Sequence, residues 1–130
     1  MSNIGTKTAR IVFRVAGIYG LSVLVPQFFL EAKVGRDSPP PITHPEFFYG
    51  FLCVAVAWQV LFLILSRAPV RYRPMMIPAV LEKIGFPIAA VILYLQGRMA
   101  PIVLAPASLD LVLCVLFAIA YVKTPTAEAA

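Results

Sequence analysis

Four long apolar runs, separated by short polar segments, dominate the pattern of the chain. Each run contains about 20 mostly apolar residues, which is the length that a helix needs to cross the hydrocarbon core of a bilayer. The runs are too long and too continuously apolar for transmembrane β-strands, which alternate over about 10 residues. The pattern predicts an all-α, integral membrane four-helix bundle that forms one domain over residues 1–130, with helices at about 11–30, 44–66, 75–96 and 101–122.

The polar segment between the first two runs contains residues that end and start helices. We expect the first helix to end at residues 31–33 and an extended segment to follow at the three prolines 39–41. Thr43 is predicted to cap the second helix, with Pro45 in its first turn. Glu46 follows Thr43 by three residues, as in a capping box, so the second helix is expected to start near Thr43.

Composition supports the membrane assignment. Hydrophobic residues make up 61% of the chain and charged residues 13%, whereas soluble domains are about 45–50% apolar and about 25% charged. The formal net charge is +5, but the cationic residues are spread over loops and helix ends, and we expect no nucleic-acid partner. We expect the lipid bilayer as partner, and a homo-oligomer or a larger membrane complex stays open.

The distribution of Lys and Arg predicts the orientation. Six basic residues lie on the side of the termini and three on the other side, which by the positive-inside rule places both termini in the cytoplasm. We expect the bacterial cytoplasmic (inner) membrane as the location. Arg67, Arg71 and Arg73 are expected among anionic lipid headgroups, with a specific lipid or anionic ligand as the alternative.

Ionisable residues inside the apolar runs are the strongest indication of function. A charge in lipid costs roughly 2.5–3.5 kcal/mol on insertion scales, so it is rarely left facing the bilayer. At about 1.5 Å per residue from the cytoplasmic helix ends, three of these polar residues share one layer. The candidate polar layer for a ligand or an ion is formed by Arg14, Gln59, Glu82, Lys83 and Asp110.

Two interpretations of this layer are open. In the structural one, Arg14 pairs with Glu82 and holds two helices together, and Asp110 is hydrogen-bonded or protonated. In the functional one, the groups line a cavity that holds a polar head group, a proton or an ion. Lys83 lies about 100° around the helix from Glu82 and is expected to reach the cytoplasmic surface instead. Asp110 falls near the midplane without an obvious cationic partner.

His44 and Glu46 form a candidate site at the opposite, outer face. A histidine beside a carboxylate suits a metal, but a third fixed ligand is not evident, and helix capping explains the pair more simply. Cys53 and Cys114 are interpreted as small buried apolar residues, since the chain has no C-x-x-C pair. The sequence contains no motif that identifies a catalytic residue, a metal site or a cofactor.

The arrangement resembles the small bacterial DoxX-like membrane proteins and, more distantly, the EXPERA-type proteins. The residues that carry the resemblance are Arg14 followed by Gly17-Ile18-Tyr19-Gly20, and Glu82 in the third helix. The DoxX-like group is associated with quinone-linked sulfur oxidation or redox homeostasis, and EXPERA-type proteins bind sterol-like ligands. The resemblance implies a four-helix membrane fold and a lipid-soluble ligand, and it assigns no catalytic residue in this chain.

Three functions fit these observations. The first is a bundle that binds a lipid, a quinone or another amphiphile in its polar layer, or that serves as an accessory subunit. The second is a membrane enzyme in which Glu82 or Asp110 acts as an acid–base on a lipid-soluble substrate. The third is a small proton-coupled exporter, which is disfavoured because no internal repeat is visible and Glu82 lies in the third helix.

Overall fold

A computed structural model describes residues 4–128, and the predicted domain ends, residues 1–3 and 129–130, lie outside them. Within this part all regular secondary structure is helical, and four of the helices are long and apolar enough to cross a membrane. The predicted fold class is confirmed at this level. The four are α1 (Ile4–Gln27), α3 (Pro45–Arg67), α4 (Met76–Leu95) and α5 (Leu104–Lys123); 3-10 turns η1 (Arg73–Met75) and η2 (Pro101–Val103) precede α4 and α5.

The helix ends differ from the predicted ones at three places. The first helix starts seven residues earlier than expected and ends at Gln27, directly after Pro26, instead of at residues 31–33. A short helix that was not expected, α2 (Glu31–Asp37), follows, and the three prolines 39–41 lie outside the helices. The N-cap of α3 is His44 rather than Thr43, and its side chain makes no capping hydrogen bond. Pro45 occupies the first turn, as predicted.

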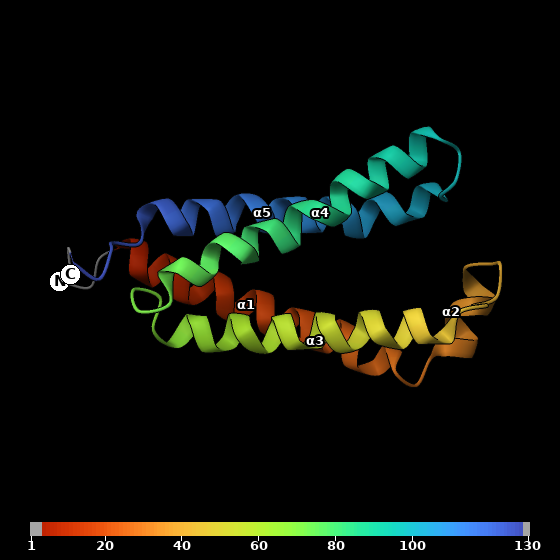
Figure 1. Ribbon diagram of the computed structural model, residues 1–130, viewed down its shortest axis with the longest axis horizontal. Coiled ribbons are helices and arrows are strands. Elements are labelled where there is room, and N and C mark those ends of the chain that lie inside the picture. The colour runs from red at the N-terminus through yellow and green to blue at the C-terminus, as the bar shows by residue number, and fades with distance from the viewer. Residues whose placement is uncertain (1–3, 129–130) are drawn as a thin grey trace.

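The four long helices form two antiparallel hairpins (Figure 1). The first hairpin contains α1 and α3, the second contains α4 and α5, and the main contact between them is made by α1 and α5. Figure 1 shows the hairpins close together at the end that carries the chain termini and diverging toward the end that carries α2. Both ends of the described chain therefore lie on one side of the bundle, as an even number of spans requires.

Three phenylalanines from three helices join the hairpins at the terminal end. Phe13 of α1 stacks on Phe117 of α5 with ring centroids 4.2 Å apart, and Phe62 of α3 meets Phe117 edge-on at 5.0 Å. All three rings are fully buried. Small residues beside them let the helices approach closely, as is common in membranes, where packing rather than exclusion of water drives association. They are Ala9, Ala16, Ala79 and Ala120.

Arg73 connects the loop after α3 to the end of α5. Its Nε donates hydrogen bonds to the carbonyl oxygens of Tyr121, at 3.2 Å, and Thr124, at 2.7 Å, and its guanidinium lies 4.0 Å from the centre of the Tyr121 ring. These carbonyls lie at the C-terminal end of α5, where the last carbonyl groups of a helix have no N–H donor within the helix itself. Arg73 therefore has a structural role at this end, in addition to the headgroup environment predicted for it.

We expect substitution of Gly5 to loosen the contact between α1 and α5. A Cβ atom on Gly5 would overlap the backbone carbonyl of Lys123, and backbone cannot move aside as a flexible side chain can. Gly5→Ala should therefore lower the free energy of unfolding by about 1–3 kcal/mol, which is typical of overpacking. The measurement is thermal unfolding in detergent, followed by circular dichroism.

Gly50→Ala is the matched control, because Gly50 also lies in a helix and a Cβ there would meet nothing within 4 Å. That variant should be as stable as the wild type or more stable by up to about 1 kcal/mol, since alanine is the better helix former. Equal stability of the Gly5→Ala and Gly50→Ala variants would contradict the close approach of α1 and α5.

Candidate functional site

A cavity of about 450 Å³ lies between the two hairpins, next to the aromatic contact. All four long helices contribute to its wall, which is mostly apolar. Its volume falls in the range of about 300–1,000 Å³ that is usual for small-molecule sites. The polar residues of its wall include Gln59, Glu82, Lys83 and Asp110, and the apolar ones include Phe51, Phe86, Leu109 and Leu113.

The structure brings four of the five candidate layer residues to this cavity. Gln59 comes from α3, Glu82 and Lys83 from α4, and Asp110 from α5. The sequence prediction did not include the apolar wall. The signal for Leu113 was present, because it lies three residues after Asp110 on the same side of the helix, and Leu109 lies four residues before Leu113.

Lys83 is the centre of an ion cluster at this cavity. Its Nζ lies 3.2 Å from Oδ1 of Asp110, to which it donates a hydrogen bond, and 3.3 Å from Oε2 of Glu82. The Lys83 side chain is 8% exposed, whereas those of Glu82 and Asp110 are 21% and 24% exposed. The cation is therefore enclosed, and both carboxylates keep an accessible part.

Glu82 has unused hydrogen-bonding capacity. Its Oε2 is buried and, among the described residues, has no partner in hydrogen-bond geometry, although Lys83 Nζ is within ion-pair distance. A buried carboxylate oxygen needs an aligned donor as well as a nearby charge, so the ion pair alone does not satisfy Oε2.

Gln59 adds an amide to the same wall. Its Nε2 donates to the carbonyl of Ala55 at 3.1 Å, one turn earlier in α3, and the residue is 3% exposed. The side chain fits because α1 presents Gly20 at this point, where a Cβ atom would overlap the Gln59 amide. The Gly20 position thus leaves room for a polar side chain beside the cavity.

Arg14 does not belong to this site. It lies on an exposed part of α1 and makes no ion pair within residues 4–128, so the predicted Arg14–Glu82 pair is wrong. The depth count estimates the level of a residue along its helix, but it carries no information about which way a helix face points. Arg14 faces outward while its neighbour Phe13 enters the core.

Two further expectations about the charges are wrong for a related reason. Lys83 does not reach for the membrane surface, and Asp110 does have a cationic partner. The long lysine stem spans the difference in level between its own backbone and Asp110. In a poorly solvated environment, attraction to two carboxylates outweighs hydration of the ammonium at the distant surface.

His44 and Glu46 lie at the other end of the molecule. His44 Nδ1 is 3.2 Å from Glu46 Oε1, and the two side chains are 67% and 65% exposed. Among residues 4–128 no group of three or more His, Cys, Asp or Glu side chains could hold a metal ion. The pair therefore supplies two groups of a metal site at most, and it is separate from the cavity between the hairpins.

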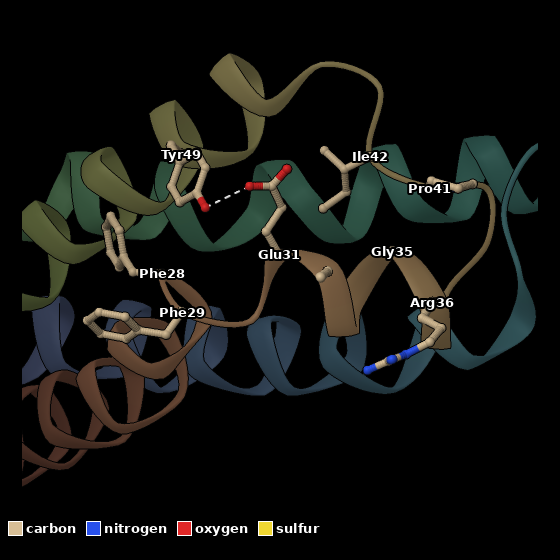
Figure 2. Close-up of a pocket in the computed structure, with 9 residues that line it drawn as sticks. Phe28, Phe29, Glu31, Gly35, Arg36, Pro41, Ile42 and Tyr49 are labelled. Atoms are coloured by element: carbon tan, nitrogen blue, oxygen red, sulfur yellow. Dashed lines mark hydrogen bonds between the residues drawn. The ribbon is translucent and has the colours of Figure 1, made fainter.

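A second cavity, of about 640 Å³, lies near this end, between α2, the following loop and the start of α3 (Figure 2). The hydroxyl of Tyr49 donates a 2.7 Å hydrogen bond to Glu31, which connects α3 to α2. Figure 2 shows this bond on one side of the pocket and Arg36 on the other. The cavity is more open than the one between the hairpins and holds no comparable ion cluster.

We expect the Lys83–Asp110 pair to show strong energetic coupling. Lys83→Met leaves two carboxylates facing each other, and Asp110→Asn leaves the ammonium with one partner, so each single change should destabilise the bundle. The double variant should be more stable than the sum of the single effects predicts, with a coupling of about 1–3 kcal/mol. Thermal or denaturant unfolding in one detergent measures all four proteins of the cycle.

Arg14→Gln is the control for this cycle, because Arg14 is exposed and unpaired within the described residues. Its effect on the free energy of unfolding should stay within about 0.5 kcal/mol. Additive effects of Lys83→Met and Asp110→Asn, or a large effect of Arg14→Gln, would contradict the ion cluster as described.

Comparisons with known proteins leave the geometry as the basis for a functional proposal. No protein-family model, no curated protein and no solved structure matches the chain. The resemblance to DoxX-like proteins therefore stays a prediction from the sequence. The cavity between the hairpins and the charges in its wall are the features of the molecule that indicate a function.

Proposed function

We propose that the protein binds an amphiphile, taken up from the membrane, in the cavity between its two hairpins. The polar head would lie against Glu82, Lys83 and Asp110, and the apolar part against the remaining wall. The observation that carries the proposal is an ion cluster, in a helix pair predicted to span the bilayer, whose two carboxylates both open into a mostly apolar cavity. Ionisable groups at such depth are costly, and they usually mark a binding or transport site.

The charges of the wall favour a particular class of head group. With all three groups ionised, two carboxylates and one ammonium give a net charge of −1. An anionic head would be repelled, whereas a hydroxyl or an amine can donate to the partly exposed carboxylates of Glu82 and Asp110 in the wall. Alcohols, quinols and amines with an apolar tail therefore fit the proposed site better than fatty acids.

We also propose the bacterial cytoplasmic membrane as the location, with both termini in the cytoplasm. The support is the excess of Lys and Arg at the terminal end, which is the pattern of cytoplasmic loops. A green fluorescent protein fused after Ala130 should fluoresce, and alkaline phosphatase at the same position should be inactive. The reverse result would overturn the orientation and leave the proposed cavity unaffected.

The proposed ligand class can be tested with two probes of equal chain length, 1-dodecanol and dodecanoate. We expect the alcohol to bind about tenfold more tightly or better, a difference of about 1.4 kcal/mol that repulsion of the carboxylate head readily supplies. Native mass spectrometry of the purified protein in a non-ionic detergent measures both. Equal or tighter binding of dodecanoate would exclude the proposed head-group selectivity.

A matched pair of tryptophan variants tests the location. Leu109→Trp places a large ring at the cavity wall and should reduce dodecanol binding strongly, whereas Leu81→Trp, on an exposed position outside the cavity, should not. Equal binding by both would place the ligand elsewhere.

A single substrate–product pair that differs between lipid extracts of deletion and wild-type cells would favour the enzyme alternative, because Glu82 and Asp110 share this cavity.

A further inference from the structure

A different polar site lies at the terminal end of the bundle. A cavity of about 440 Å³ is lined there by three arginines from two helices and a loop. Arg10 lies on α1, Arg67 is the last residue of α3, and Arg71 lies in the loop before η1. Thr6, the loop backbone around Pro69 and Ala127 near the end of the described chain complete the wall.

These three guanidinium groups have no anionic partner in the described part of the protein. None of the ion pairs formed within residues 4–128 includes Arg10, Arg67 or Arg71. Arg71 lies 5.5 Å from the centre of the Tyr72 ring, which uses the face of the guanidinium and not its N–H donors. Glu128, next to Ala127 of the wall, is the acidic residue of this end among those described, and it makes no ion pair there.

Arg73, two residues after Arg71, does have hydrogen-bond acceptors within the protein. Arg73 donates to two carbonyl oxygens of α5 and has an aromatic ring beneath it. Two residues earlier, Arg71 instead lines the pocket. The pocket therefore gathers three cations whose repulsion is not relieved by the protein itself.

We infer that this pocket binds a phosphate-bearing anion. Arginine presents paired N–H donors that match phosphate oxygens, and three such groups around one cavity can satisfy several oxygens at once. The pocket lies where the predicted spans end, because Arg67 closes the second span and Arg10 lies in the second turn of the first. This is the level at which lipid headgroups are found, so an anionic phospholipid and a free phosphate are the two sources of the ligand.

The test compares two double variants with the same loss of charge at the same end of the molecule. Arg10→Gln/Arg67→Gln removes two pocket arginines, and Lys7→Gln/Lys123→Gln removes two exposed cations outside the pocket. The probe is phosphatidylglycerol added to the detergent-purified protein, with retained lipid counted by native mass spectrometry. We expect the pocket variant to bind about 25-fold more weakly, at about fivefold per arginine, and the control to bind like the wild type.

A single variant distinguishes the loss of a binding group from a folding defect. Arg71→Gln changes an exposed loop residue and should weaken binding about fivefold while leaving the thermal unfolding temperature unchanged. Equal weakening in the pocket and control double variants would overturn the inference, because it would show diffuse attraction to a basic surface. No weakening in the pocket variant would overturn it as well.

Inorganic phosphate separates the two sources. If excess phosphate displaces phosphatidylglycerol from the wild type, and the pocket variant no longer responds, the free anion is a ligand of the site. If phosphate does not displace the lipid, the lipid headgroup is the ligand. Either result is independent of dodecanol binding, so the pocket of arginines and the cavity between the hairpins are tested separately.

Discussion

The stack of Phe13 on Phe117 determines the arrangement of the rest of the bundle. Each hairpin forms by contact between helices adjacent in the chain, α1 with α3 and α4 with α5. The hairpins themselves meet where these two rings stack at 4.2 Å and Phe62 closes the cluster. Lipid tails are as apolar as the rings, so shape complementarity has to hold this contact. Beyond it the helices diverge, and the cavity begins.

The ion cluster lies at this boundary between packed and open structure. Lys83 Nζ is 5.7 Å from the centre of the Phe62 ring, so the enclosed cation lies on the aromatic core while its two carboxylate partners line the cavity. The structural and functional interpretations of these charges are therefore compatible. Lys83 connects α4 to α5 through Asp110, and both of its carboxylate partners belong to the wall of a cavity that a ligand can fill.

Sequence patterns predicted the fold well because run length and apolar content alone indicate helices that are long and apolar enough to cross a membrane. The site was predicted less completely, because a count along a helix gives the level of a residue but not its direction. Gln59 and Glu82 were placed at one level and do share the cavity, whereas Arg14 at a similar level faces outward. The pairing of Lys83 with Asp110 depends on which helices are neighbours and on the reach of a flexible side chain, and neither can be read from spacing.

The two polar sites differ in charge, so each would select a different class of membrane molecule. The cavity between the hairpins carries two carboxylates for one ammonium, whereas the terminal pocket carries three guanidinium groups without a paired carboxylate among the described residues. A phospholipid with a phosphate head would therefore be repelled from the first and attracted to the second. Only amphiphiles without a negative charge would gain by entering the cavity. Occupation of the arginine pocket by lipid would then hold the bundle at the membrane boundary without competing for that cavity.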